Sequence, residues 1–275
     1  MYIDLHLHST ASDGTDAPAA LPALLRAHNV TTFSLTDHDT VDGLAPLEKA
    51  DLTGLRFIPG IEFSCITESG KCHILGYGFD RTHPAFLAAL DAGREKRREK
   101  LALRLDYLKT HFGLALTDAE AAWLRAIPSP GKPHLAKLLV DRGLAPDIAT
   151  AIKAHIDPCP TGSDRIGADL AVSAILASGG TPVWAHPLGG EGERPLTGEQ
   201  FSAQLQTLLA CGIRGLECYY SRYEDAQIRF LLETAQAHSL LITGGSDYHG
   251  TAKPGITPGK LSAQNLHLSH LPLPF

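Results

Sequence analysis

The sequence predicts an α/β fold with a mainly parallel sheet, either open or closed into a barrel. Short β-like runs alternate with stretches of helical periodicity along most of the chain. This βαβα alternation is typical of parallel sheets, because parallel strands are joined by helical crossovers. One long stretch breaks the alternation, since residues 84–166 carry almost only helical patterns. We therefore predict a helical insertion over one mouth of the sheet domain.

The elements expected along the chain follow from these local patterns. Strands are predicted at Tyr2–His8, Thr31–Asp37, Leu55–Phe63, Cys72–Phe79, Pro182–His186, Ile213–Tyr220 and Leu240–Gly244, and helices at Pro18–Asn29, Gly167–Ala177, Gln200–Cys211 and Glu224–His238. The sheet domain would then comprise residues 1–83 and 167–275, with 84–166 as the inserted cap. The charged run 93–100 is interpreted as a solvated helix face with i,i+4 pairs, with contact to an anionic substrate as the alternative. The tail from Lys253, rich in proline and glycine, is expected to wrap over the surface.

Composition limits the possible functions. A chain of 275 residues can bury a sizeable core without disulfide or metal staples. Its net charge of −6 argues against broad binding to nucleic acid, so an anionic substrate would need local cations, which metal ions can supply. Five cysteines without a CxxC pair predict free thiols. No signal peptide and no apolar run of membrane-spanning length are evident, so we expect a cytoplasmic protein.

Two histidines occupy alternate positions at the end of the first predicted strand, His6 and His8. Alternate side chains of a strand share one face, so both rings point the same way and can chelate a metal. An HxH pair alone is weak evidence, because two polar residues at a strand end explain it equally well.

Further residues of metal-ligand type lie at the ends of other predicted strands or close to them. They are Asp13, Asp37, His38, Asp39, Glu62, His73, His186, Asp247 and His249. Each has an ordinary structural explanation, but strand ends converge on one face of parallel α/β folds, where sites are built. The mixture of imidazoles and carboxylates suits Zn, Mn or Fe rather than Ca, and the absence of cysteine disfavours a structural zinc site.

On these motifs the sequence resembles the PHP (polymerase and histidinol phosphatase) family. The matching segments are His6-Leu-His8, Asp13, Thr36-Asp-His38, Gly60-Ile-Glu62, His73, Ala185-His186-Pro and Gly245-Ser-Asp247-Tyr-His249. The resemblance implies a distorted (β/α)7 TIM-like barrel with three divalent metal ions, Mn first and Zn or Fe as alternatives. It also implies a ligand set: one metal held by His6, His8, Glu62 and Asp247, a second by Asp13, His38 and His249, and a third by His73 and His186 with Glu62 bridging.

Such metals would present hydroxide as the nucleophile and neutralise phosphate oxygens. We take Glu62, Asp13, Asp37 and His249 as the catalytic set. The leaving oxygen also needs a proton or a metal, and Asp37, Asp39 and a metal-bound water all remain candidates for this role.

Residues outside the metal set resemble the branch of nucleoside 3′,5′-bisphosphate phosphatases, some of which act as 5′→3′ oligoribonucleases. The segments are Lys132-Pro-His134-Leu-Ala and the run 215–222. The implied reaction removes the 3′-phosphate of a nucleoside 3′,5′-bisphosphate, and a bisphosphate needs a second anion site. Our candidates for that site are Lys132, His134, Arg165 and Arg222, although Lys132 stands where the family pattern leads us to expect arginine. Trp184, Tyr219 and Tyr220 are expected in the core, with base stacking as the alternative.

Three rival functions remain. Histidinol phosphate or a nucleic-acid end would keep the metal chemistry, but the long insertion favours a nucleotide-sized substrate. A regulatory metal-binding module without turnover conflicts with the complete ligand set, and amide hydrolysis lacks the bridging lysine or second HxH pair of amidohydrolases. We expect a small nucleotide or short oligoribonucleotide as partner, with no membrane and no stable nucleic-acid complex. Oligomeric state is not readable from the sequence.

Overall fold

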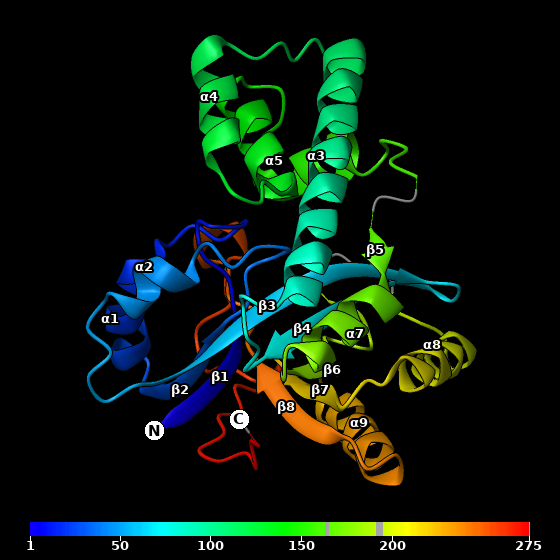
Figure 1. Cartoon of the computed structure of the whole chain (residues 1–275). Coiled ribbons are helices and arrows are strands. Elements are labelled where there is room, and N and C mark those ends of the chain that lie inside the picture. Colours follow the sequence, from blue (N-terminus) through cyan, green and yellow to red (C-terminus); the bar gives the residue numbers. More distant parts are fainter. Residues whose placement is uncertain (163–164, 191–194, 275) are drawn as a thin grey trace.

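The computed structural model describes residues 1–162, 165–190 and 195–274, and its centre is a curved sheet (Figure 1). The sheet has the strand order β1-β2-β3-β4-β6-β7-β8, and the short β5 pairs with β3. Its strands are β1 (Tyr2–Leu7), β2 (Val30–Leu35), β3 (Arg56–Thr67), β4 (Gly70–Tyr77), β5 (Ile166–Gly167), β6 (Thr181–Trp184), β7 (Gly215–Tyr220) and β8 (Leu241–Gly245). This nearly closed barrel confirms the predicted fold class.

The first and last strands of the sheet meet and nearly close the barrel. The amide of Asp247 donates to the carbonyl of His6, and the amide of His8 donates to the carbonyl of Tyr248, both at 2.9 Å. A Cβ atom on Gly245 would lie 2.1 Å from the Cβ of His6, so only glycine permits this approach. Closure therefore brings the first and the last of the sequence motifs, His6-Leu-His8 and Gly245-Ser-Asp247-Tyr-His249, together in space.

The direction of one strand departs from a simple parallel sheet. β4 runs antiparallel to both of its neighbours, β3 and β6, whereas the other strand pairs are parallel. The turn between β3 and β4 holds only Glu68 and Ser69, and such a short connection can join only antiparallel strands. The prediction of a mainly parallel sheet is right, but β4 forms a hairpin with β3.

Helices cover the outside of the sheet. They are η1 (Pro18–Ala20), α1 (Leu21–Ala27), α2 (Leu44–Glu48), α7 (Ala168–Ala177), α8 (Gly198–Cys211) and α9 (Asp225–Ala237). α2 and β5 were not predicted, because both are too short to show a period. The main hydrophobic core lies between sheet and helices and includes Trp184 and Tyr220, which confirms core packing for these two aromatic residues.

The helical insertion stands over the mouth of the barrel (Figure 1). It consists of α3 (Pro84–Phe112), α4 (Asp118–Ala126), α5 (Lys132–Asp141), α6 (Ile148–Ala151) and the π-helical η2 (Ile152–Ile156). These helices form their own hydrophobic cluster, to which α3 contributes Leu108, whereas its first turns place Phe86 and Leu90 in the barrel core. α3 thus belongs to both parts, and a domain boundary at residue 84 stays a prediction.

Three local predictions can be compared directly with the structure. In the charged run of α3 the exposed pairs are i,i+3, Lys96 with Glu99 and Arg98 with Glu95, rather than i,i+4. The tail does more than cover the surface, since Leu271 is buried against β1. All five cysteines are free, as predicted.

Within the described residues, no helix is both long and apolar enough to cross a membrane.

Candidate metal centre

The nine predicted metal ligands gather at the barrel mouth, some within strands and some in the segments that follow them. β1 supplies His6 and, one residue past its end, His8; β3 and β4 supply Glu62 and His73. The others lie in the segments that follow β1, β2, β6 and β8: Asp13, His38, His186, Asp247 and His249. The expected convergence is therefore present, but Glu62 and His73 lie within β3 and β4 rather than at their ends, because β3 continues to Thr67 and turns back into β4.

Glu62 lies at the centre of this cluster and is completely buried. Five imidazole nitrogens lie between 3.0 and 3.2 Å from its two carboxylate oxygens, those of His6, His8, His38, His73 and His186. One carboxylate contacting five rings is suited to bridging ions, which is the position that the family resemblance implied for it.

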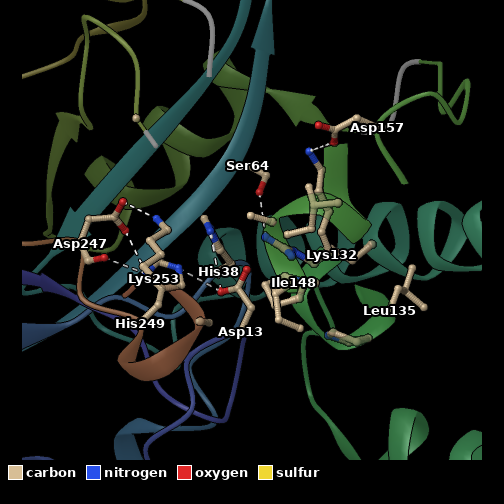
Figure 2. Close-up of a pocket in the computed structure, with 18 of the residues that line it drawn as sticks. Asp13, His38, Ser64, Lys132, Leu135, Ile148, Asp157, Asp247, His249 and Lys253 are labelled. Carbon is tan, nitrogen blue, oxygen red and sulfur yellow. Dashed lines mark hydrogen bonds and ion pairs between the residues drawn. The ribbon is translucent and has the colours of Figure 1, made fainter. Parts of the chain in front are cut away.

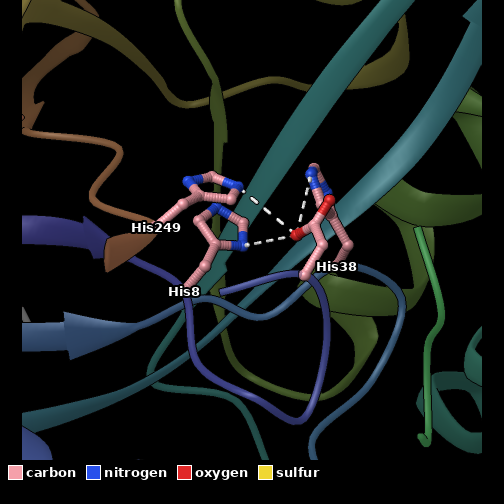
Figure 3. Close-up of side chains that lie close together, drawn as sticks. His8, His38 and His249 are labelled. Atoms are coloured by element: carbon pink, nitrogen blue, oxygen red, sulfur yellow. Dashed lines mark ion pairs between the residues drawn. The ribbon is translucent and has the colours of Figure 1, made fainter. Parts of the chain in front are cut away.

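A second group of side chains surrounds Asp13. Figure 3 shows the rings of His8, His38 and His249 turned toward one carboxylate oxygen, which lies 3.9, 4.0 and 3.3 Å from their nearest nitrogens. A third group comprises His6, His8 and Asp247. All three arrangements, including the one of His38, Glu62 and His73, place potential ligand atoms within 4.8 Å of one another.

Several buried polar atoms of the cluster make no hydrogen bond of acceptable geometry, even where an imidazole nitrogen and a carboxylate oxygen lie close together. They include Oδ1 of Asp13, Nδ1 of His38 and Oε2 of Glu62. An unpaired buried polar atom costs about 1–3 kcal/mol, so three of them in one cluster indicate a missing partner. Ring nitrogens of His6 and His8 also face each other at 3.1 Å. Divalent cations would satisfy all of these atoms, and the donor set fits them.

Burial and neighbouring charges shift the pKa values of several side chains in this cluster. Burial alone would raise the pKa of Asp13 and Glu62, but the neighbouring imidazoles, His38 first, hold both well below their usual range. Burial lowers the pKa of His38 and His249, against the opposing effect of the nearby carboxylates. His6 differs, because the surrounding carboxylates outweigh burial and raise its pKa, so an arriving cation would compete with a proton there.

A further buried carboxylate, Glu217 on β7, orients the cluster from behind. It lies 2.9 Å from Nδ1 of His6, and its other oxygen accepts a hydrogen bond from the backbone amide of His186 at 2.8 Å. This contact turns Nε2 of His6 toward the site, as expected when a ligand histidine is held by a carboxylate. The sequence analysis gave Glu217 no role, although it lies within the run 215–222 singled out there.

Two acids that the sequence analysis considered for proton transfer are fixed outside the cavity. Asp37 accepts hydrogen bonds from the amide and hydroxyl of Ser9 and from the hydroxyl of Ser12, all at 2.6–2.7 Å. Asp39 accepts from the amide of Ser64 and from Nε of Arg97 at 2.8 and 2.6 Å. Neither acid is among the described residues that line the cavity. The structure shows both organising the loops that carry Asp13 and His38.

Local backbone geometry at the site is unusual. Asp39, His186 and Asp247 have φ values of +50°, +28° and +57°, which side chains rarely adopt. Such strain costs of order 1 kcal/mol for each residue and persists where neighbouring contacts enforce it. For Asp247 these contacts are the hydroxyl of Tyr220 at 3.0 Å and the ammonium of Lys253 at 2.5 Å.

A cavity of about 1170 Å³ opens above the cluster and continues into the insertion (Figure 2). Of the predicted substrate contacts, Lys132 and Arg165 line it. His134 lies behind the wall, where its Nδ1 accepts from the amide of Gly131 at 3.0 Å. Arg222 is exposed and is not among the described lining residues.

The cavity wall also carries cations outside the predicted substrate contacts. They are Arg97, Lys100, Arg104, Lys153 and Lys253. Arg97 and Lys100 belong to the charged run 93–100, for which contact with an anionic substrate was the alternative interpretation. Arg97, Lys100 and Arg104 follow an i, i+3, i+7 spacing on α3, which places them on one helix face. This spacing is visible in the sequence, but only the position of α3 over the barrel shows which face points inward.

Relatives of known activity match nearly the whole chain. A 5′-3′ exoribonuclease (Rnm) of Escherichia coli is 33% identical over 90% of this chain and 84% of the relative. A 3′,5′-nucleoside bisphosphate phosphatase of Chromobacterium violaceum is 31% identical over 94% and 90%. A phosphoribosyl 1,2-cyclic phosphate 1,2-diphosphodiesterase of Eggerthella lenta is 31% identical over 91% and 95%. No family model matches the chain.

The chain belongs to the PHP family of metal-dependent phosphoesterases. Solved structures agree with this membership. A protein of Bifidobacterium adolescentis described as a metal-dependent phosphoesterase has a TM-score of 0.83 and 27% identity, covering 97% of this chain and 92% of its own. A Chromobacterium violaceum protein described as an amidohydrolase, with sulfate and no metal, gives the same TM-score and identity over 99% and 93%. This PHP protein thus shares its barrel and its insertion with proteins of nearly equal length.

Proposed function

We propose that this PHP phosphoesterase hydrolyses the 3′-phosphate of nucleoside 3′,5′-bisphosphates. The observation that carries the proposal is the buried, Glu62-centred ligand cluster at the base of a cavity whose walls hold further cations. Its relatives share phosphoester hydrolysis but differ in substrate. The choice of substrate proposed for this chain is therefore argued from the residues that line the cavity.

The ligand set fits three divalent ions, with manganese as the first choice and zinc or iron as alternatives. His6, His8, Glu62 and Asp247 would hold one ion, Asp13, His38 and His249 a second, and His73 and His186 a third together with Glu62. When bound, these ions supply activation of a water molecule and neutralisation of phosphate oxygens.

The residues of the chain itself exclude water from the cluster and place side chains toward the reacting phosphate. Glu62 is 0% exposed, so the charges around it act in a medium of low polarity, where electrostatic interactions are strong. Asp13 lies 3.3 Å from Nε2 of His249, at the side of the cluster that borders the cavity, so both are placed to contact the reacting phosphate. Asp37 supports this arrangement by holding Ser9 and Ser12 of the same loop.

The second phosphate of the substrate needs its own cationic position. Lys132 and Arg165 line the cavity above the cluster. Lys132 forms an ion pair with Asp157 at 2.6 Å, and Arg165 donates to the carbonyl of Cys72 at 3.1 Å, next to His73. Lys132 is thus held by the insertion and Arg165 by β4 of the barrel, and we propose that they receive the 5′-phosphate.

A 5′-3′ exoribonuclease activity on short oligoribonucleotides is the second candidate. A cavity of about 1170 Å³ exceeds the upper end, roughly 1000 Å³, of ordinary small-molecule pockets. The same cleavage, next to the 3′-oxygen of the first nucleotide, would release a 5′-mononucleotide from an oligonucleotide.

The deciding experiment measures phosphate and nucleotide release by the manganese-loaded protein. The substrates are adenosine 3′,5′-bisphosphate, 5′-AMP, histidinol phosphate and a short 5′-phosphorylated oligoribonucleotide. We expect preferred hydrolysis of the bisphosphate to AMP and phosphate, together with loss of this activity in His73→Asn. The matched control is His238→Asn, a change at an exposed histidine after α9.

Two outcomes would contradict the proposal. Turnover of histidinol phosphate alone would exclude a nucleotide substrate but keep the metal chemistry. Absence of turnover for every substrate, in a protein that binds manganese, would favour a metal-binding module without catalysis.

A further inference from the structure

The cavity continues past both phosphate positions of the proposed substrate. The 3′-phosphate is assigned to the metal centre and the 5′-phosphate to Lys132 and Arg165. Three more cations, Lys100, Arg104 and Lys153, line the part of the cavity that lies within the insertion. A single bisphosphate leaves these three cations without a function in substrate binding.

One face of α3 leads from the metal centre into this part. Arg97, Lys100, Leu101 and Arg104 are spaced so that they lie on the same side of the helix, and all four are half-buried. With a rise of 1.5 Å per residue, Lys100 lies about 4.5 Å and Arg104 about 10.5 Å beyond Arg97 along the axis. Since Arg97 is bound to Asp39 beside the metal cluster, positive charge continues outward in steps of about one helical turn.

α6 and η2 also line this part of the cavity. Ile148 and Ile152 face the cavity together with Lys153, and Leu101 of α3 adds to the apolar lining. Figure 2 shows Ile148 and Leu135 near Lys132, on the side of the cavity away from Asp247 and His249. Aliphatic side chains beside ammonium and guanidinium groups suit a ligand with both phosphate and an apolar ring surface.

The charge of this region is opposite to that of the chain. Apart from the proposed metal ligands and from Arg97 and Lys253, the described charged residues of the lining are five cations and two carboxylates, namely Lys100, Arg104, Lys132, Lys153 and Arg165 against Asp147 and Asp157. The chain as a whole has a net charge of −6. A phosphate monoester carries about −1.5 to −2 at pH 7, and the two cations Lys132 and Arg165 are already assigned to the 5′-phosphate, so Lys100, Arg104 and Lys153 are placed to contact a further phosphate.

We propose that Lys100, Arg104 and Lys153 form an outer subsite for a further phosphate on the 5′ side of the substrate. This inference rests on the proposed function, which places the 3′-phosphate at the metals. Two sources share the chemistry: a 5′-triphosphate on the same nucleotide, and a phosphate one nucleotide upstream in a short RNA.

The test compares substrates that differ only on the 5′ side. They are adenosine 3′,5′-bisphosphate, adenosine 3′-phosphate 5′-triphosphate, and a 5′-phosphorylated adenosine dinucleotide with a terminal 3′-phosphate. For the wild-type protein we expect a lower KM than for the bisphosphate with the triphosphate, with the dinucleotide, or with both. The substrate whose KM is lower identifies the source of the further phosphate. Lys100→Gln and Lys153→Gln should each raise that KM about three- to tenfold and leave the KM of the bisphosphate within about twofold.

Lys109→Gln is the matched control, because Lys109 lies on α3, is exposed and is not among the described lining residues. The salt dependence gives a second readout. Each cation removed from a phosphate contact should reduce the slope of log affinity against log salt concentration by about 0.7. The control should leave this slope unchanged.

A binding measurement separates failure of the subsite from failure of the proposed function. ATP and AMP carry no 3′-phosphate, so their affinities can be measured by calorimetry at a fixed manganese concentration whether or not bisphosphates are hydrolysed. Tighter binding of ATP than of AMP, reduced by Lys100→Gln and not by Lys109→Gln, supports the outer subsite. Equal effects of the two variants, or no gain in affinity or KM from either kind of added phosphate, would overturn it.

Discussion

The two ends of the cavity are built in opposite ways. At the barrel end, His6 and Glu62 are completely buried, and a further layer of groups such as Glu217 holds them. At the insertion end, Lys132 is 41% exposed and its partner Asp157 equally so. Buried charges interact strongly, whereas exposed ones are screened by water and salt. The barrel end is therefore suited to chemistry that needs fixed geometry, and the insertion end to adjustable recognition of anions.

Neutralising the central carboxylate should have the largest effect. Glu62→Gln keeps the shape of the side chain but removes the charge that faces five imidazoles, so we expect at least about a 10³-fold fall in kcat. Bound manganese, measured by elemental analysis, should fall as well. Glu68→Gln on the same hairpin is the control, because Glu68 is exposed. Near-normal activity of Glu62→Gln would show that the cluster is not the catalytic centre.

Removing the supporting carboxylate should have a smaller effect of the same kind. Glu217→Gln weakens the hold on the ring of His6, and we expect about a 10- to 100-fold loss of metal affinity. Activity should recover at high manganese concentration, which distinguishes loss of orientation from loss of a group that contacts the substrate. Unchanged metal affinity in a folded variant would remove Glu217 from this role.

The third comparison concerns stability along one helix. The side chain of Arg97 is 12% exposed and pairs with buried Asp39, whereas Arg98 is 70% exposed and pairs with Glu95. Arg97→Gln leaves an uncompensated buried carboxylate, so we expect a loss of about 3 kcal/mol in the free energy of unfolding. Thermal unfolding should then shift down by about 5–10 °C. Arg98→Gln should change stability by less than about 0.5 kcal/mol, and equal shifts would contradict the contrast.

The smallest effect is expected at the insertion end. Lys132→Gln removes an exposed cation from the cavity wall and should raise the KM for the bisphosphate about three- to tenfold, with little change in kcat. Lys137→Gln on the same helix is the control, because Lys137 pairs with Asp141 away from the cavity. Arg222→Gln should resemble the control. A KM increase for Arg222→Gln equal to that of Lys132→Gln would support the sequence-based assignment of Arg222 to the substrate.

Much of the fold was predictable because it depends on local patterns. The period of each segment identified the strands and long helices, and strand ends with polar residues located the candidate cluster. The direction of β4 was missed, because alternation of apolar residues has no polarity along the chain. The two-residue turn before β4 was the available signal for a hairpin.

The substrate wall was less predictable. Lys132, from a segment of family resemblance, and Arg165, proposed as a cation for the second anion site, both line the cavity. Arg222, from the other segment of resemblance, is not among the described lining residues. Lys253 was assigned to a surface tail, yet the short turn η3 (Gly250–Ala252) returns it to the carboxylate of Asp247. A turn of this kind depends on contacts with Thr15, which is far away in sequence.

The sequence by itself determined which residue types stand at the candidate metal site, because strand periodicity and residue type are local properties that need no coordinates. Only the tertiary structure decided which charged groups lie close to one another and which of them are buried. Closure of β8 on β1 joins Asp247 to His6, and the position of α3 turns Arg97 inward and Arg98 outward. These outcomes depend on contacts between distant segments, and the free energy of a charged side chain follows from its burial and its partners rather than from its neighbours in sequence.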